Sequence, residues 1–465
     1  MEIKRVESYP KRIELNGILQ HPENDTWEVD DYPVSSAMGC FAEENSSNIH
    51  ERYAVKGELY KSGKKELTWN QAQELIMKET SGRGHGAVLD KAIFNWSIDN
   101  LTRASTLFLC SPQYLWHLQQ SLRRANAKRG FEELIGDEEM GKRGFSQISA
   151  KNGNKIMEEQ FELYNKMCGA GVDTEDARII LPLHTKTTID TGGNAREMMH
   201  LKSMVDRMNV TSEVRDTVYT MYEQAREFAP RTMEEREKNF EVLAWMPSSQ
   251  LYARQNMPMD NKIREREKIK QLTGNNNFCI GYSIGLQMSE KEIEQAVLQR
   301  DEALLANLKS THFTFMVPMS LMSFHQAARQ RTWDQSVETL ESAVRRGSFT
   351  VPPKIKAAGY EKELLDLAEE SRKYVLNNLD KNPDVFGVVP HCLEVYDLIH
   401  VNGWNALHSI GKRRCKTAQW DIRSKAVQMS NEIRVVYPAL GKYSLPQGML
   451  YGSCPERENC GRCKV

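Results

Sequence analysis

Residues 84–124 read GHGAVLDKAIFNWSIDNLTRASTLFLCSPQYLWHLQQSLRR, and residues 304–346 read LLANLKSTHFTFMVPMSLMSFHQAARQRTWDQSVETLESAVRR. Each stretch passes from a strand-like apolar core into a helix that carries polar and basic residues. The first phenylalanines of the two cores are Phe94 and Phe313, which sets an offset of 219 between the stretches. The two stretches therefore read as two versions of one segment.

The landmarks that follow also occur twice. A proline-ended apolar run reads RIILP at 178–182 and FGVVP at 386–390, and an Asn-led helix then starts at Asn194 and at Asn402. The prolines and the asparagines share an offset of 208. A repeat of this length indicates a duplicated domain, because solenoid units repeat about every 20–50 residues.

The composition is that of a soluble globular protein. Hydrophobic residues make up 40% of the 465 residues and charged residues 27%, and a chain of this length fits two domains that each bury a core. The 62 basic and 63 acidic residues leave a net charge of −1. No global field therefore favours nucleic acid or an anionic membrane, and an anion site must be local.

The first residues, MEIKRVESYPKR, contain no apolar segment of the kind that a secretory signal has. The longest apolar stretches are interrupted by proline or polar residues and fall short of a membrane span. The nine cysteines are then expected to be reduced thiols or metal ligands. We expect a cytoplasmic protein with no membrane partner.

Several elements can be placed by pattern. Residues 68–80 predict a helix that begins after Thr68, and residues 155–170 predict an amphipathic helix that ends at a glycine. The run FEVLAWMP at 240–247 is interpreted as a new first strand, and residues 253–278 as a surface insertion or mobile loop. The aromatic residues of the two strand-like cores are expected in the core: Phe94, Trp96, Phe313 and Phe315.

Four basic segments are candidates for an anion site. HQAARQR is predicted to place Gln326, Arg329 and Gln330 on adjacent turns of one helix, with Arg331 beside them. Guanidinium groups suit phosphate because they offer planar paired donors. Ser121 and Arg123 in QQSLRR, Arg178 in EDARIILP and Arg413 before AQWDIR are the others. For each segment the alternative is structural: a solvated basic helix face, exposed arginines, or a packed helix with a surface arginine pair.

These motifs, in this order, resemble those of flavin-dependent thymidylate synthase, the enzyme family that converts dUMP to dTMP. That family shows G-H-x-S-x-L-E-H-x-x-F-T-F, then H-Q-x-x-R-H-R followed by E-x-S-x-R. E-D-A-R-x-x-L-P, N-A-R-E and R-x-x-x-x-A-Q-W-E-I-R come after these. The resemblance covers about 84–215 and 304–425. It implies two tandem α/β domains, each a mainly antiparallel sheet flanked by helices, over 1–235 and 236–442, with a cysteine-containing tail over 443–465.

Each copy departs from the family's motifs at different points. Copy one lacks R-H-R, with Ser111, Pro112 and Gln113 in its place, and its late helix has lost A-Q-W-E-I-R. Copy two has Val337, Thr339 and Glu341 in place of E-x-S-x-R, and Phe386 in place of the A-R-x-x-L-P arginine. What one copy lost the other kept, so we expect one composite site between the copies. A homodimer of this chain would then imitate the family's tetramer.

The resemblance implies a role for each retained residue. The expected dUMP-binding residues are Gln119, Ser121, Arg123, Arg178, Gln326, Arg329 and Arg413. Of these, Arg413 would stabilise the N3-deprotonated uracil and so act in catalysis. The expected FAD-binding residues are Asn194, Ala195, Arg196, His312, Arg329, Gln330, Arg331, Asn402 and His408. NADPH would reduce FAD, and methylenetetrahydrofolate would supply the carbon.

The losses at the family's histidines keep other functions open. The histidine of L-E-H is Lys91 in copy one and Ser310 in copy two, and Gln330 replaces the central histidine of R-H-R. One alternative is a related flavoenzyme that modifies C5 of a uracil nucleotide with another group or donor. The other is a catalytically inactive paralogue that binds a nucleotide. A role in nucleic-acid binding is disfavoured by the balanced charge.

The tail YGSCPERENCGRCKV adds a possible metal site. Cys460 and Cys463 have the CxxC spacing that suits zinc, and Cys454 and Cys415 are the expected third and fourth ligands. A structural zinc would hold a segment that has little core of its own. The alternative is a tail without metal, whose thiols are reduced.

Overall fold

The computed structural model describes residues 12–18, 27–122, 127–136, 145–237, 250–254 and 256–454. The chain forms two compact units. The first consists of Met1–Ser121, Ala127–Glu132 and His184–Pro247, and the second of Leu122–Asn126, Glu133–Leu183 and Ser248–Val465. The predicted repeat bounds stay a prediction, since a repeat is defined by sequence and a compact unit by packing. The segment FEVLAWMP lies outside the described residues.

The first unit is built on a four-stranded antiparallel sheet. Its strands lie in the order β1 (Arg12–Ile18), β4 (Ile93–Thr102), β6 (Lys186–Asn194) and β5 (Trp116–Gln119). Along β4, buried and more exposed side chains alternate, as expected of a sheet with one face in the core. Phe94 and Trp96 are fully buried, which confirms their predicted place in the core.

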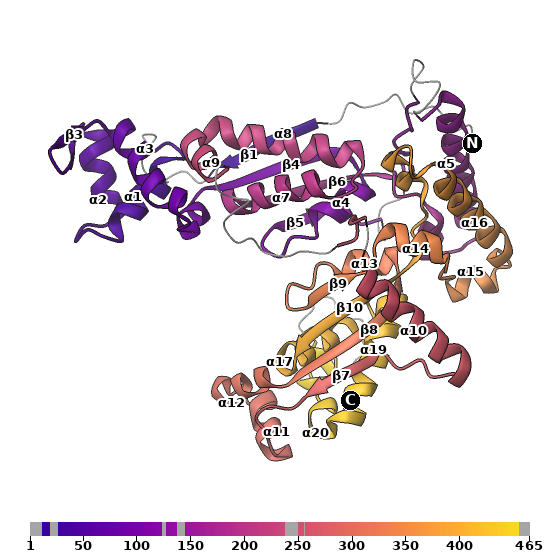
Figure 1. The fold of residues 1–465 in the computed structure, drawn as a ribbon. Helices are drawn as coiled ribbons and strands as arrows, with labels where there is room; N and C mark the ends of the chain where they lie inside the picture. The colour runs from indigo at the N-terminus through magenta and orange to yellow at the C-terminus, as the bar shows by residue number, and fades with distance from the viewer. Residues whose placement is uncertain are drawn as a thin grey trace. The chain divides into compact units, whose positions relative to one another are not determined.

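The second unit contains the matching sheet. Its strands lie in the order β7 (Cys279–Ser283), β8 (His312–Ser320), β10 (Glu394–Asn402) and β9 (Asp334–Val337). Each neighbouring pair is again antiparallel. Phe313 and Phe315 are fully buried, as predicted. Each sheet lies among helices, so the predicted α/β class is confirmed (Figure 1).

The two sheets share one strand register. Ile93 lies opposite Asn194 in the first sheet, and His312 lies opposite Asn402 in the second. Ile189 and Asp397 are equivalent by the offset of 208, so their partners, Gln119 of β5 and Val337 of β9, also occupy equivalent positions. Because a one-residue slip would turn every side chain to the other face, a shared register is a demanding test of duplication. The correspondence of QQSLR with VETLE therefore holds in three dimensions.

Helices cover the first sheet. The chain begins α3 (Trp69–Glu79) with a capping box between Thr68 and Gln71, which confirms the predicted helix start. Helices α7 (Ala195–Arg207) and α8 (Ser212–Phe228) pack on the strands of this unit (Figure 1). The remaining elements of this unit are α1 (Asp31–Gly39), α2 (Ser46–His50), η1 (Glu51–Val55), β2 (Tyr60–Ser62), β3 (Lys65–Leu67), η2 (Ser81–Arg83), η3 (Gly86–Lys91), α4 (Arg103–Leu109) and α9 (Pro230–Glu237).

The second unit combines a helix pair with its sheet. The pair is α5 (Gln147–Gly169), which confirms the amphipathic helix predicted at 155–170, and α16 (Glu361–Asn378). Gln160 of α5 donates to Ser371 Oγ of α16 at 2.9 Å. The helices before β9 are α6 (Thr174–Ala177), η4 (Arg178–Ile180), α10 (Met257–Thr273), α11 (Glu290–Leu298), α12 (Glu302–Asn307), η5 (Leu308–Ser310) and α13 (Leu321–Ala327). The later ones are α14 (Leu340–Arg346), α15 (Pro353–Ala357), η6 (Pro383–Val388), α17 (Gly403–Asn405), η7 (Ala406–Ile410), α18 (Gly411–Arg413), α19 (Trp420–Val436), α20 (Pro438–Gly441) and α21 (Gln447–Leu450).

The two proline-ended runs pair with each other inside the second unit. Leu183 donates its backbone N–H to the Val389 carbonyl at 2.9 Å, and His391 donates to the Leu181 carbonyl at 3.1 Å. The offset of 208 relates Leu183 to His391 and Leu181 to Val389. The two hydrogen bonds are therefore the same contact made in both directions. This is the pattern of a local two-fold axis, and it joins a segment of copy one to its counterpart in copy two.

Residues 257–273 form a helix, so the predicted insertion or mobile loop at 253–278 is wrong over most of its length. Met259 and Ile263 of α10 pack against Met316 and Tyr396 of the second sheet. This i, i+4 spacing places both side chains on one helix face. The other residues of the helix are mostly charged, which concealed its short apolar face.

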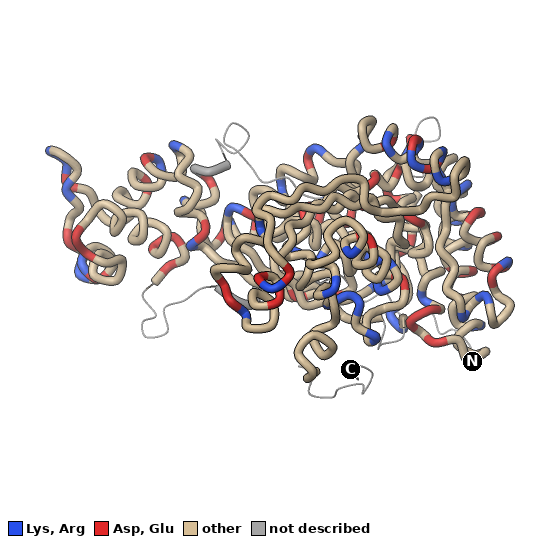
Figure 2. The backbone as a smooth tube through the Cα atoms, turned by 90° about the horizontal axis from the view of Figure 1, so that it is seen from below, with Lys and Arg blue, Asp and Glu red and all other residues tan. Residues whose placement is uncertain are grey.

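Charged residues are distributed evenly. Basic and acidic positions are interleaved along the described chain (Figure 2), in keeping with the net charge of −1. Among the residues that the structure describes, no helix is long and apolar enough to cross a membrane.

Candidate functional site

The first part of the candidate site is the end of α13 and the turn that follows it. Ser320 caps α13, its Oγ accepting from the Ser323 backbone N–H at 3.1 Å. After the helix ends, Gln330 donates its backbone N–H to the Ala327 carbonyl at 2.8 Å, which closes a turn. The predicted single helix is therefore wrong beyond Ala327, and the turn leaves Arg329 and Arg331 exposed and Gln330 half-buried between them.

The second part is Arg413. It follows β10 through the π-helical turn η7, and π-helical turns are rare and concentrate at functional sites. Arg413 Nη2 donates to the Gln326 main-chain carbonyl at 3.1 Å. With the Gln330 amide oriented so that its oxygen faces the guanidinium, Arg413 Nε donates to that oxygen at 2.7 Å. The structure therefore brings together three predicted site residues that are far apart in the sequence.

Arg178 belongs to the same compact unit, although it comes from copy one. It opens η4, and its Nε donates to the Glu175 carbonyl at 3.1 Å. The neighbouring carboxyl of Asp176 is buried, and burial raises its pKa, while Lys354 at 4.0 Å and the Trp420 indole lower it. Trp420 is the tryptophan of AQWDIR. The copy-one loop therefore lies against the copy-two motif.

A pair of stacked histidines, His391 and His325, also joins the segment that carries Arg178 to the segment that carries Gln326. His391 Nδ1 lies 2.7 Å from the Leu181 carbonyl, and the His391 ring stacks on His325 with 5.5 Å between centroids. His325 immediately precedes Gln326. Arg178 and Gln326 are thus linked through packed neighbours within one unit.

The predicted flavin residues of copy two lie around β8 and η7. Asn402 caps the helix after β10, its Oδ1 accepting from the Asn405 backbone N–H at 2.9 Å. His408 is exposed on η7. His312 stacks on His400 with 5.1 Å between ring centroids.

Two buried polar atoms test whether a ligand fits this site. Gln326 Nε2 and His312 Nδ1 are buried and have no hydrogen-bond partner among the described residues. Buried polar groups are nearly always hydrogen-bonded, so unmet groups at predicted ligand positions favour an additional partner. The residues present therefore fit a polar nucleotide or flavin.

The other predicted site residues belong to the first unit. Gln119 ends β5 and Ser121 follows it, whereas Arg123 lies outside the described residues. Asn194 caps α7, with Ala195 as its first residue. Arg196 Nη2 donates to Asp90 at 2.8 Å, and Asn194 donates to the same carboxylate at 3.0 Å.

Copy two has lost both partners of this ion pair together. Asp90 and Arg196 correspond to Lys309 and Trp404, by the offsets of 219 and 208. A lysine beside an arginine would be repulsive, so the joint replacement is physically consistent. The sequence alone shows each change, but their pairing becomes clear only from the structure.

Sequence reasoning missed an acidic residue that stands at equivalent positions in the late helices of the two copies. Glu213 of α8 accepts from the Thr102 backbone N–H at 3.2 Å, and Asp421 of α19 accepts from the equivalent Ser320 N–H at 3.1 Å. Copy one thus kept the acid and the final arginine of the A-Q-W-E-I-R motif, although its other letters changed. The signal in the sequence was SEVR, which the offset of 208 aligns with WDIR.

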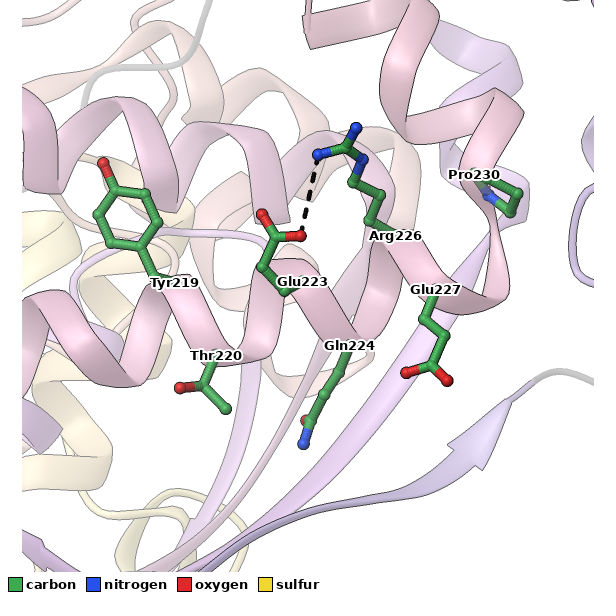
Figure 3. Close-up of a pocket in the computed structure, with 7 residues that line it drawn as sticks. All are labelled: Tyr219, Thr220, Glu223, Gln224, Arg226, Glu227 and Pro230. Atoms are coloured by element: carbon green, nitrogen blue, oxygen red, sulfur yellow. Dashed lines mark ion pairs between the residues drawn. The ribbon is translucent and has the colours of Figure 1, made fainter.

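The open groove along α8 contains none of the predicted site residues. Figure 3 shows its lining side chains, all on or just after one helix: Tyr219, Thr220, Glu223, Gln224, Arg226, Glu227 and Pro230. A mixed-charge groove on one helix lacks the convergent polar groups that a substrate site needs.

The predicted zinc ligands are only partly described. Cys415 Sγ lies 3.1 Å from Thr417 Oγ1, and Cys454 is half-buried. Cys460 and Cys463 lie outside the described residues. Within the described ranges, no three His, Cys, Asp or Glu side chains gather as a metal site.

Fold and site together define a duplicated α/β protein with an arginine held by glutamine groups. The pattern of the family described as "Thymidylate synthase complementing protein" matches residues 29–231 and 251–439, most of the chain. The chain therefore belongs to this family. The two matched segments agree with the tandem arrangement inferred from the repeat.

Several relatives carry the name flavin-dependent thymidylate synthase. The one from Thermococcus onnurineus (strain NA1) is 30% identical over 150 residues, 32% of this chain and 60% of that protein. The one from Pyrococcus furiosus is 30% identical over 151 residues, 31% of this chain and 58% of that protein. The one from Geobacter sulfurreducens is 27% identical over 164 residues, 33% of this chain and 70% of that protein. The chain thus spans less than two thirds of the length of the first two relatives.

A solved structure of a UMP/dUMP methylase, PolB from Streptomyces cacaoi bound with 5-Br dUMP, aligns with 50% of this chain and 96% of that chain. The TM-score is 0.35 and the sequence identity 17%. This likeness is too slight to support a statement about the chain.

Proposed function

We propose that the protein is a flavin-dependent thymidylate synthase. It would methylate dUMP reductively to dTMP with methylenetetrahydrofolate and NADPH. The observation that carries the proposal is the hydrogen bonding of Arg413 to Gln326 and Gln330, in the same compact unit as Arg178. Membership of the family and the names of the relatives support it.

The residues divide the work by their chemistry. Arg178, Ser121 and Arg123 would bind the phosphate and sugar, because guanidinium and hydroxyl groups donate to phosphate oxygens. Gln326 and Arg329 would contact dUMP from copy two, and Gln119 would do so from copy one. Arg413 would lie at the uracil and stabilise negative charge on the ring, which makes C5 nucleophilic.

The flavin would be held by residues of both copies: Arg329, Gln330, Arg331, Asn402, His408 and His312 of copy two, and Asn194, Ala195 and Arg196 of copy one. When bound, FAD supplies the hydride chemistry that no side chain can provide. The unmet donor capacity of Gln326 and His312 supports a ligand at this place.

The composite site explains why each copy lost a different half. With Arg178 and Arg413 in one compact unit, one complete set of residues suffices, and the reciprocal set is free to change. A homodimer would then imitate the family's tetramer, and light scattering of the purified protein tests this.

Zinc in the tail remains a separate proposal. Cys415, Cys454, Cys460 and Cys463 would bind it, and metal analysis of the purified protein would show one equivalent that is lost in Cys460→Ser. Protein with less than a tenth of an equivalent would contradict the site.

A related reaction at uracil C5 is the second candidate. The substitution of the family's R-H-R histidine by Gln330, together with Lys91 and Ser310, favours it. The mass of the product distinguishes a methyl group from any other C5 substituent.

Tritium release from [5-³H]dUMP tests the main proposal. The assay contains FAD, NADPH and methylenetetrahydrofolate, and each is then omitted. Release that requires all three supports thymidylate synthesis. No release from folded protein that retains FAD would contradict it.

A further inference from the structure

The side chain of Gln330 contacts the guanidinium group of Arg413. Its amide oxygen accepts from Arg413 Nε at 2.7 Å, and Arg413 Nη2 also points at this oxygen. In the reverse orientation, the amide NH2 group of Gln330 would face the N–H groups of Arg413, and no hydrogen bond could form. The guanidinium therefore fixes which way the amide points.

The Gln326 carbonyl completes the arrangement. It accepts from Arg413 Nη2 at 3.1 Å, so one helix end and one turn supply oxygens to the same guanidinium. A planar guanidinium held by two fixed acceptors cannot rotate freely. The plane of Arg413 is thus set by groups that come from α13 and from the turn after it.

The turn itself is fastened to the segment that carries Arg413. Trp333 Nε1 donates to Ser409 Oγ at 2.6 Å, and Trp333 donates its backbone N–H to the Gln330 carbonyl at 3.0 Å. Trp333 and Ser409 are both buried. Gln330 therefore approaches Arg413 from a rigid base, and not as a loose surface side chain.

We infer that Gln330 is a positioning residue for Arg413, which it holds in the orientation that meets the uracil ring, and that its side chain is not primarily a flavin ligand. This inference rests on the proposed function. For the Gln330 side chain, it replaces the flavin contact that the resemblance implies and that is proposed above.

Glutamine suits this task for a chemical reason. Its oxygen accepts from the guanidinium without neutralising the charge, so Arg413 keeps its full positive charge for the substrate. A carboxylate would hold the same geometry but neutralise part of that charge. A thioether of equal length would accept only weakly.

The test uses two variants of the full-length protein, loaded with FAD for the dUMP and kinetic measurements and freed of FAD for the FAD titration. Gln330→Met removes the acceptor at nearly constant length, and Gln330→Glu restores an acceptor. Gln447→Met makes the same chemical change at an exposed glutamine of the same unit and serves as the control. For each protein, the dissociation constants of FAD and of dUMP are measured, together with kcat and KM for dUMP.

Gln330→Met is expected to weaken dUMP binding by about tenfold, since hydrogen bonds to charged groups have effects of this size. FAD binding should stay within about twofold of the wild type. Gln330→Glu should recover most of the dUMP affinity but lower kcat, because orientation is restored and charge is reduced. Gln447→Met should match the wild type.

Two results would overturn the inference. In the first, Gln330→Met loses FAD affinity and keeps dUMP affinity, which would make Gln330 a flavin ligand. In the second, Gln330→Glu binds dUMP as weakly as Gln330→Met. Failure of the proposed function is distinguishable, because it would appear in the wild type itself, as no dTMP formed or as no binding of FAD and dUMP.

Discussion

Glu213 and Asp421 make the same contact in the two copies, at positions that the repeat makes equivalent. Glu213 accepts from the Thr102 backbone N–H at 3.2 Å, and Asp421 accepts from the Ser320 N–H at 3.1 Å and from its hydroxyl at 2.7 Å. Each acid thereby ties the helix that follows the central strand to the late helix. This contact survived in both copies, whereas the predicted ligand residues did not, so it serves the fold.

The amide substitution Asp421→Asn is expected to lower the free energy of unfolding by about 1–3 kcal/mol, because Asp421 is buried and its charge strengthens both hydrogen bonds. Glu213→Gln should cost less, since Glu213 is only half-buried. Urea unfolding measures both, with the exposed Asp216→Asn of α8 as control. Equal stability of Asp421→Asn and the wild type would contradict this role.

The buried Asp397 side chain is expected to make the folded protein less stable as the pH rises. It is fully buried on β10, and burial raises its pKa to about 7, although Gln335 donates to it at 2.5 Å and lowers the value. Above pH 7 the aspartate is ionised in the folded and the unfolded protein, and the folded state carries the full cost of burying the charge. Below about pH 4 both states are protonated and the cost disappears.

Asp397→Asn should therefore be more stable than the wild type at pH 8, by at most about 4 kcal/mol for a shift of this size. The advantage should shrink as the pH falls from 7 to 4. Unfolding free energies at pH 8, 6 and 4 measure it. An asparagine variant that is less stable than the wild type at pH 8 would show that the charge is compensated.

Arg178 and Arg413 offer a test of whether the site is built within one chain. If both residues act in the same site of one chain, co-expressed Arg178→Ala and Arg413→Ala chains should release no tritium from [5-³H]dUMP. In a site shared between two chains, a mixed oligomer would recover one complete set. Recovered activity in the mixture would therefore contradict the single-chain site.

Regular elements of this fold could be predicted where local signals are strong. Thr68 and the periodic residues after it define α3, and the alternating aromatics from Phe94 and Phe313 define the central strands. Helix α10 was missed because only Met259 and Ile263 are buried in it. Its end signals were present: the Asn256 cap, a proline in the first turn and Gly274 after the last.

The candidate site was predictable as a list of residues but not as an arrangement. Motif spacing identifies Gln330 and Arg413 separately, yet nothing local shows that the amide of one faces the guanidinium of the other. Tertiary hydrogen bonds depend on how β8 and β10 pair. The equivalence of Gln119 and Val337, in contrast, could be predicted from the motif letters, and the strand pairing agrees with it. Its offset of 218 is one less than that of Phe94 and Phe313, because β4 has 10 residues and β8 has 9.

The most direct measurement is tritium release from [5-³H]dUMP by four variants, assayed with FAD, NADPH and methylenetetrahydrofolate. Arg178→Ala and Arg413→Ala remove the retained residues of the composite site. Glu341→Ala and Phe386→Leu change the reciprocal positions. The first two should lose at least about 100-fold in kcat/KM, which corresponds to about 3 kcal/mol of transition-state stabilisation, and the second two should keep wild-type release. Equal loss in all four, or full activity in Arg413→Ala, would contradict a single working site built from both copies.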